Sequence, residues 1–348
     1  MLNNYALAQF ALSLFDRVWR WDDPPPIAQH IARRWLGVLG LLLAAWTGLS
    51  LTLYATQPDA PTVRVAAIQP NLPRAAHRDT QTTSAQRLAI LATQTRQAAA
   101  QGAQVIVWPE MALGFDPQVQ YTPDLKALAA ETGAYLVIGY VVDDKESFRN
   151  EAILLAPAGR FLDVYAKTHP MIASGEPRTV SAGTYPVYEA PWGRLAAMIC
   201  FDASFTDVAR RLSQQGAGVI AVPSLFGPSL AGLPHTQLVF RAIESRAAMV
   251  MSDVAFHSAV IDAYGHMREM AIAPHGAGAI LVADVPLGTG HTVYARCGDW
   301  LGWLSLGGMA FFALWMPLTQ RHSKGLLHRK LCHLTPEELP KERFFCLG

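Results

Sequence analysis

Three residues that could together form a nucleophilic centre each stand where a predicted strand ends. Glu110 follows a strand at 105–108, Lys167 follows one at 160–166, and Cys200 follows one at 195–199. A carboxylate can accept the proton of a thiol, the thiolate can attack a carbonyl carbon, and an ammonium group can stabilise the resulting oxyanion. Catalytic groups of α/β proteins gather outside strand ends, so we expect the three to converge. The pattern predicts acyl transfer through a thioester.

Cys200 lies between two segments of different periodicity. Five apolar residues, 195–199, precede it, and the apolar side chains of 205–212 recur along one helical face. The cysteine is therefore predicted at a strand-to-helix turn, where backbone N–H groups and a helix N-terminus favour negative charge on sulfur. The alternative is a small buried hydrophobic residue, since free cysteine is among the most buried residue types.

The other candidates also have ordinary structural interpretations. Glu110, after a Trp-Pro pair, could cap a turn, and Lys167 could be a surface lysine at a strand end. A fourth candidate, Glu176, follows Ser-Gly and could be an exposed turn residue. The ordered set argues for chemistry more strongly than any member alone. The sequence contains no metal-binding or nucleotide-binding motif such as His-Glu-x-x-His or a P-loop, so we expect no cofactor and no metal site.

Alternating strands and helices, interrupted by hairpins, predict an α/β layered domain with mixed sheets. Further strands are expected at 63–69, 135–142, 151–156, 218–222, 249–254 and 279–285. Helices are expected at 82–100, 123–132, 205–212 and 235–248. Hairpins are expected around 157–159 and 262–265.

The composition excludes one class of partner and points to another. The net charge of +1, with no basic block interleaved with aromatic residues, makes nucleic acid an unlikely partner. The mean hydropathy of +0.18 is high for a chain of 348 residues, and two uncharged segments, 35–58 and 300–320, account for it. About 20 apolar residues cross a bilayer as a helix. We therefore expect transmembrane helices at 35–56 and 300–320.

Charges beside these two segments predict the orientation. Basic residues precede the first segment and follow the second, whereas Asp59 and Asp299 lie on the inner flanks. The positive-inside rule places both termini in the cytoplasm, with the catalytic domain in the periplasm of a Gram-negative inner membrane. A cleaved signal peptide is the alternative for the first segment. The expected organisation is a cytoplasmic amphipathic segment at 1–34, a span at 35–56, a catalytic domain at 62–292, a span at 300–320 and a cytoplasmic basic tail at 321–348.

The four cysteines do not predict a disulfide. Cys332 and Cys346 fall in the predicted cytoplasmic tail, so only Cys200 and Cys297 share a compartment. A bridge between these two would consume the candidate nucleophile. We therefore predict that Cys200 is free.

Six motifs in a fixed order resemble a known superfamily. They are Val65-Ala66-Ala67-Ile68-Gln69-Pro70-Asn71, Val107-Trp108-Pro109-Glu110, Tyr165-Ala166-Lys167-Thr168-His169 with Gly175-Glu176, Ile199-Cys200-Phe201-Asp202, Phe240-Arg241-Ala242-Ile243-Glu244-Ser245-Arg246, and Val293-Tyr294-Ala295-Arg296-Cys297-Gly298-Asp299-Trp300. The chain resembles the nitrilase, or carbon-nitrogen hydrolase, superfamily. The last motif, which leads into an apolar segment, is similar to the apolipoprotein N-acyltransferase branch, here with a reduced membrane domain.

This resemblance implies a fold, a reaction and a role for each candidate. The fold would be an α-β-β-α sandwich, with Glu110 as general base and Cys200 as nucleophile. Lys167 would stabilise the oxyanion, assisted by the Phe201 backbone N–H, and Glu176 would position the site. The family reaction moves an acyl chain from a membrane phospholipid to the amine of a lipoprotein N-terminus. The alternatives are a membrane-anchored amidase or nitrilase-like hydrolase, in which water replaces the amine, and a non-catalytic conjugal-transfer accessory protein.

Overall fold

The structure is a computed structural model that describes residues 29–55, 60–72, 83–143, 148–177, 183–227 and 233–311. The chain divides into two compact units. One unit is Gln57–Gly298, and the other combines the flanking segments Met1–Thr56 and Asp299–Gly348. The candidate site residues all belong to the Gln57–Gly298 unit.

The first sheet of this unit has six strands in the order β12-β1-β2-β3-β4-β5. The strands β1, β2 and β3 are parallel, and the others pair antiparallel with their neighbours. Their bounds are β1 (Thr62–Gln69), β2 (Val105–Val107), β3 (Tyr135–Asp143), β4 (Phe148–Leu155), β5 (Phe161–Ala166) and β12 (Ala279–Pro286). The predicted hairpin at 157–159 joins β4 to β5.

The second sheet also has six strands, in the order β11-β10-β9-β8-β7-β6. Its inner strands β7, β8 and β9 are parallel. The bounds are β6 (Val187–Ala190), β7 (Gly193–Ala197), β8 (Val219–Ser224), β9 (Ala248–Asp253), β10 (His257–Ile261) and β11 (Met267–Ile272). The carboxyl ends of β7, β8 and β9 therefore meet at one edge of this sheet.

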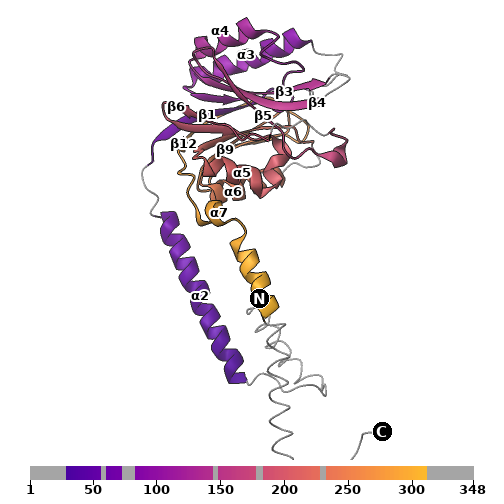
Figure 1. The fold of residues 1–348 in the computed structure, drawn as a ribbon. Helices are drawn as coiled ribbons and strands as arrows, with labels where there is room; N and C mark the ends of the chain where they lie inside the picture. Colours follow the sequence, from indigo (N-terminus) through magenta and orange to yellow (C-terminus); the bar gives the residue numbers. More distant parts are fainter. Residues whose placement is uncertain are drawn as a thin grey trace, which may run out of the picture. The chain divides into compact units, whose positions relative to one another are not determined.

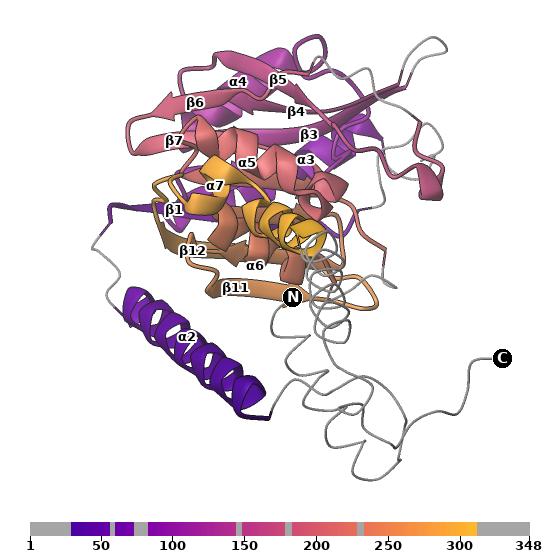
Figure 2. The same cartoon turned by 60° about the horizontal axis from the view of Figure 1, so that its bottom comes forward.

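Helices cover the outer face of each sheet. In Figure 1, α3 (Ser84–Ala100) and α4 (Thr122–Thr132) lie over the first sheet, and α5 (Thr206–Gln214) and α6 (Leu233–Ser245) lie over the second. The short α7 (Val293–Cys297) lies against α5 and α6, as Figure 2 also shows. The four layers are helix, sheet, sheet and helix, which is the nitrilase-like sandwich that the resemblance predicts.

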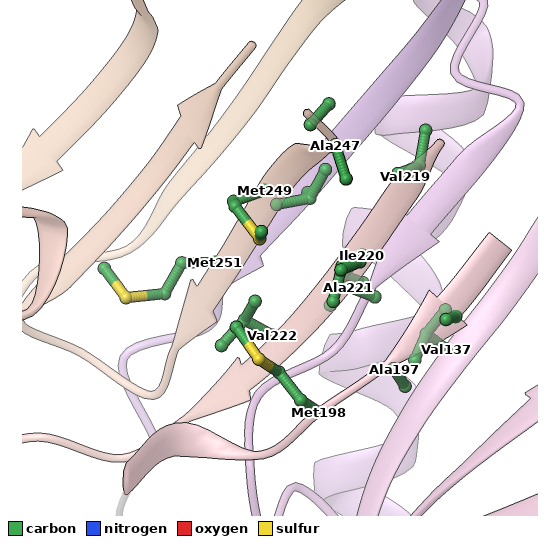
Figure 3. Packing of buried hydrophobic residues seen from close by; sticks show 14 of the residues in the cluster. Val137, Ala197, Met198, Val219, Ile220, Ala221, Val222, Ala247, Met249 and Met251 are labelled. Atoms are coloured by element: carbon green, nitrogen blue, oxygen red, sulfur yellow. The ribbon is translucent and has the colours of Figure 1, made fainter. Parts of the chain in front are cut away.

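Strand periodicity explains why both faces of the sheets are buried. In β1, Val63, Val65 and Ala67 pack toward the second sheet, whereas Ala66 and Ile68 pack among the side chains under α3 and α4. Figure 3 shows residues of the same buried cluster on β8 and β9, whose valine, isoleucine and methionine side chains lie on both faces of the second sheet. Full burial of one such side chain contributes about 1.5–3 kcal/mol. This core fixes the strand ends that carry the site.

The structure departs from the sequence expectations at two places in the Gln57–Gly298 unit. The strand predicted at 195–199 ends at Ala197, and a 3-10 helix, η2 (Cys200–Ser204), comes between it and α5. Strand β6 was not predicted, because its short sequence, Val-Tyr-Glu-Ala, carries little periodic signal. The other predicted strands and helices are present with ends shifted by a few residues.

In the described part of the flanking unit, residues 29–55 and 299–311, two helices have exposed apolar side chains. One is α2 (Gln29–Ala55), and the other covers 300–311. Within the described ranges, the structure holds no helix with the length and apolar character needed to cross a bilayer. The transmembrane helices predicted at 35–56 and 300–320 are therefore not confirmed. The described part of the second segment is shorter than the about 20 residues that a span needs. Residues 1–28 and 312–348, which include the predicted basic tail, lie outside the described residues.

Candidate active site

A buried lysine joins two glutamates at the centre of the candidate site. Lys167 Nζ lies 2.8 Å from Glu110 Oε1 and 2.7 Å from Glu176 Oε2. Only 2% of Lys167 and 2% of Glu110 is exposed. Burial alone would lower the pKa of Lys167, but the charges of Glu110, Cys200 and Glu176 raise it well above its usual value. The lysine therefore stays an ammonium ion, and it joins Glu176, nine residues away, to Glu110, 57 residues away, in one cluster.

The sheet delivers Glu110 and Lys167 to the same place from different strands. Pro109 ends β2, and the backbone N–H of Glu110 donates to the carbonyl of Ser224 at the end of β8 in the other sheet. A Cβ placed on Gly139 of β3 would lie 2.2 Å from the carbonyl oxygen of Pro109, so glycine permits this close approach. Lys167 follows β5, and its N–H donates to the carbonyl of Asn150 in β4.

Asn150 is a site residue that the sequence reasoning did not identify. Its Nδ2 donates to Glu110 Oε1 at 2.6 Å and to Glu176 Oε1 at 2.7 Å. Glu176 is held further by the backbone N–H of Met171, which donates to Oε2 at 2.7 Å. Asn150 stands between Arg149 and Glu151, just before the strand predicted at 151–156, so its only sequence signal is that asparagine is depleted in strands such as β4.

Cys200 lies at the turn that its flanking pattern predicts, in a conformation unusual for a side chain larger than glycine. Its φ is 48°, in the left-handed region, and it begins η2. It is free of a disulfide, as predicted. The residue is only 3% exposed, and the thiol donates to the Leu225 carbonyl at 3.9 Å.

The surroundings of the sulfur are polar as well as apolar. Burial raises the pKa of the Cys200 thiol well above its usual value, and the charge of Glu110 raises it further. Lys167 and the Leu225 carbonyl contact act in the opposite direction. Cys200 is therefore a protonated thiol that interacts with a carboxylate and an ammonium group, which sets it apart from a cysteine that merely fills a core.

Asp202 ties the cysteine turn to the chain that follows Lys167. Its buried carboxylate accepts hydrogen bonds from the Ile199 N–H at 3.0 Å, the His169 N–H at 2.7 Å and the Tyr165 hydroxyl at 2.7 Å. Burial raises the pKa of Asp202 to about 6, although these donors oppose the shift. One carboxylate thus fixes the distance between the β5 exit and the β7 exit.

A stacked aromatic group lies next to this connection. The His169 ring stacks on Phe205 with centroids 3.9 Å apart, and its Nε2 lies 2.8 Å from Asp207 Oδ1. Phe205 meets Phe201, the neighbour of the cysteine, edge to face at 5.3 Å. These rings form a partly exposed border of the cysteine turn.

The next strand ends along the same edge carry a second buried polar group. Asp253, at the end of β9, accepts from the N–H groups of Phe226, Ala255 and Phe256, and burial raises its pKa to about 6. His257 Nε2 lies 2.9 Å from His235 Nδ1, and burial lowers the pKa of His257 to about 4. These residues hold the segments beyond β8 and β9 in place.

A comparison with known protein families identifies the family of this chain. The profile of the carbon-nitrogen hydrolase family matches residues 64–294, more than half of the chain. The chain belongs to this family. Among solved structures, an amidase of the nitrilase superfamily from Nesterenkonia AN1 superimposes with a TM-score of 0.54 and 20% identity, covering 66% of this chain and 92% of that one.

Curated members of the carbon-nitrogen hydrolase family include both transferases and hydrolases. An apolipoprotein N-acyltransferase of Geobacter metallireducens is 28% identical over 88% of this chain and 63% of its own length. One from Azotobacter vinelandii is 27% identical over 93% of this chain and 65% of its own length. A nitrilase of Pyrococcus abyssi is 29% identical over 55% of this chain and 74% of its own. The chain thus spans less than two thirds of the two acyltransferases.

The structure brings together the site residues that the sequence predicts. Glu110, Lys167 and Glu176 form one hydrogen-bonded cluster, and both Glu110 and Lys167 act on the pKa of Cys200. Phe201 follows the cysteine within η2. The catalytic role of each residue remains a prediction. No group of three metal-ligating side chains occurs in the described segments.

Proposed function

We propose that this chain is an acyl-transferring enzyme that forms a thioester at Cys200. The observation that carries the proposal is the buried Glu110–Lys167–Glu176 cluster beside a cysteine at a left-handed turn. Ionised side chains are rarely buried without a structural or functional reason, because desolvation costs several kcal/mol per ion. A carboxylate, a cation and a thiol that interact electrostatically are the groups that covalent catalysis requires, and this supports the proposal.

The first half-reaction transfers an acyl group to sulfur. The Cys200 Sγ–H proton passes to the Glu110 carboxylate as Sγ attacks the carbonyl carbon of an ester. The oxyanion is stabilised by the Lys167 ammonium and the Phe201 N–H. When the tetrahedral intermediate collapses, the C–O bond breaks and the alcohol leaves with the proton that Glu110 had taken. The product is a thioester on Cys200.

The second half-reaction passes the acyl group to an amine. The neutral amine attacks the thioester carbonyl and gives a proton to Glu110, and the C–S bond breaks as the thiol is restored. We propose a phospholipid as donor and the N-terminal amine of a lipoprotein as acceptor. The named apolipoprotein N-acyltransferases among the relatives support this choice, since they align with most of this chain.

Apolar surface in the flanking unit supports a site at a membrane. In α2, Leu41 is 74% exposed and Trp46 is 68% exposed, and Trp303 is 72% exposed in the helix at 300–311. Large contiguous apolar surfaces mark binding to lipid or to another protein. We propose attachment to the bacterial inner membrane, with the catalytic domain in the periplasm.

A membrane-attached hydrolase is the second candidate. The nitrilase and amidase relatives favour it, because they share the family fold. In this reaction water, activated by Glu110, would attack the acyl-enzyme in place of the amine. The two candidates share the first half-reaction and differ only in the acceptor.

A trapping experiment tests the proposal. Membranes containing the full chain are incubated with phospholipid labelled in its acyl chain, and the chain is then isolated and treated with neutral hydroxylamine. We expect a hydroxylamine-sensitive label on the wild type and on Cys297→Ser, and none of this thioester-type label on Cys200→Ser. Turnover of a small amide without any label would favour the hydrolase. Inactivity toward both substrates, with normal cellular function of Cys200→Ala, would leave a non-catalytic binding protein and overturn the proposal.

A further inference from the structure

Asn150 occupies a position between the two glutamates that the proposed reaction does not explain. It is fully buried, and the two hydrogens of its side-chain amide are directed to different carboxylates, Glu110 Oε1 and Glu176 Oε1. A primary amide is the smallest neutral side chain with two donors on one atom. The asparagine therefore bridges two anions without adding a charge.

The charges of the cluster show why a bridge is needed. Glu110 and Glu176 bring two negative charges, and Lys167 supplies one positive charge. Two neighbouring buried carboxylates tend to share a proton, which would remove one base. The amide of Asn150 and the ammonium of Lys167 contact both glutamates and close a ring of four side chains. The ring thus places one cation and two amide hydrogens against the two carboxylates.

The same contacts distinguish the two oxygens of Glu110. Oε1 accepts from both Lys167 Nζ and Asn150 Nδ2. The orientation of the carboxylate is thereby fixed, and Oε2 is the oxygen that is left for the thiol proton. A base held in one orientation transfers protons more effectively than one that rotates.

The other end of the amide supports this orientation. Among the described residues, Asn150 Oδ1 is a buried oxygen without a hydrogen-bond partner. An unsatisfied buried oxygen lowers the stability of the fold. Rotating the amide by half a turn would lower it more, because this oxygen would then face the two carboxylates and both hydrogen bonds to them would be lost. The structure thus accepts one unsatisfied oxygen in order to place both donors on the glutamates.

We propose that Asn150 is a positioning residue that bridges Glu110 and Glu176 and presents Glu110 Oε2 to the Cys200 thiol. The inference rests on the proposed role of Glu110 as base. It does not depend on which acyl donor or acceptor the enzyme uses, because it concerns the proton transfer from the thiol.

The test measures thiol reactivity without any substrate. The rate of Cys200 alkylation by iodoacetamide is followed by mass spectrometry from pH 5 to 9 in the full chain. Asn150→Leu keeps the side-chain volume but removes both donors, and Asn150→Ser keeps one. On acidification the alkylation rate falls, and we call this part of the pH–rate profile the acidic limb. We expect the acidic limb to lie about one pH unit higher in the leucine variant than in the wild type, and to shift by less in the serine variant.

Two controls separate positioning from a loss of stability. Asp262 is a buried residue that follows β10 at the opposite end from His257, away from the site edge, so Asp262→Asn should destabilise the fold and leave the pH limb unchanged. Glu110→Gln should remove the part of the limb that depends on the carboxylate and leave only the rise that follows ionisation of the thiol itself. If Asn150→Leu does not fold, the serine variant carries the test.

The outcomes distinguish the inference from the proposed function. A wild-type pH limb in a folded Asn150 variant, or an equal shift in Asp262→Asn, would overturn the inference. A shifted limb in the Asn150 variants, combined with no acyl label on the wild-type chain, would uphold the inference and overturn the proposed acyl transfer.

Discussion

The thiol of Cys200 depends on a neighbouring base because its own surroundings do not ionise it. Burial and the charge of Glu110 raise its pKa, and Lys167 opposes them. A cysteine at pH 7 with a raised pKa holds very little thiolate. In the proposed reaction the proton moves to Glu110 as sulfur attacks the carbonyl, so we expect the two events to belong to one step.

Glu110→Gln should expose this dependence. The glutamine cannot accept the thiol proton, so we expect alkylation of Cys200 at pH 7 to slow by about 100-fold or more, the range usual for loss of a general base. Mass spectrometry of the intact chain measures the rate. The exposed Cys297 provides an internal reference that should react as in the wild type. Equal rates at Cys200 in both proteins would contradict the role given to Glu110.

From the sequence, the strand ends that carry the candidate site residues could be predicted, but the side chains that link these residues by hydrogen bonds could not. Hydrophobic periodicity placed Glu110, Lys167 and Cys200 after strands, and the structure has all three there, although β7 stops at Ala197. Asn150 escaped notice because its partners are 40 and 26 residues away, and single-chain periodicity carries no information on such pairing. The aspartate that links two strand exits, Asp202, was noticed only as part of a motif.

The meeting of β2 and β3 controls the position of Glu110. The Pro109 carbonyl lies so close to Gly139 that any side chain would collide with the backbone. The β3 backbone also holds Trp108, because the backbone N–H of Trp108 donates to the Val137 carbonyl at 2.8 Å. Two strands thus place Glu110 through backbone contacts rather than through side-chain packing.

Gly139→Ala should therefore slow alkylation of the Cys200 thiol more than the small volume of one added methyl group would suggest. The added Cβ, 2.2 Å from the Pro109 oxygen, forces the segment before Glu110 to shift, and a shift of about 1 Å at a catalytic group can cost about 100-fold in rate. The measurement is thiol alkylation together with thermal unfolding. Gly278→Ala is a matched control, because its Cβ would make ordinary contacts of 3.6 Å. Full reactivity in Gly139→Ala would refute this account of the strand contact.

The two units differ in the surface that they present. The Gln57–Gly298 unit buries its apolar residues between four layers, whereas the flanking unit exposes leucine and tryptophan side chains along α2 and along residues 300–311. A lipid-modifying enzyme needs its thiol near the bilayer surface, so the proposed function requires this apolar surface to bind lipid.

Charged substitutions on α2 test this requirement. We expect Leu41→Lys combined with Trp46→Lys to weaken flotation of the full chain with phospholipid vesicles, because each lysine at an apolar membrane position costs about 2.5–3.5 kcal/mol. Ile90→Lys, on the exposed side of α3, serves as the control and should float as the wild type does. Undiminished flotation of the double variant would argue against lipid binding through α2.

Buried ionisable groups make the stability of the whole fold depend on pH in two opposing ways. The pKa of both Asp202 and Asp253 is raised to about 6, so the stability that their protonated forms contribute is present below about pH 4 and is lost as the pH rises through 6. The pKa of His257 is lowered to about 4, so its contribution is present above about pH 6.5 and is lost as the pH falls through 4. Between pH 7 and 4.5 the histidine and the two aspartates therefore partly cancel.

Removing the histidine should reveal the opposing trend. When the pH falls from 7 to 4.5, His257 alone lowers the free energy of unfolding by about 2 kcal/mol. The reason is that this histidine takes up a proton in the unfolded chain but stays largely neutral in the folded chain. The free energy of unfolding of His257→Asn should therefore rise on acidification by about 2 kcal/mol relative to the wild type. Urea titrations at both pH values measure the difference, and His291→Asn, at an exposed position, should follow the wild type. The same pH dependence in the wild type and in His257→Asn would mean that His257 is charged in the folded state. The buried pair of His257 and His235 would then hold a positive charge at the edge of the second sheet.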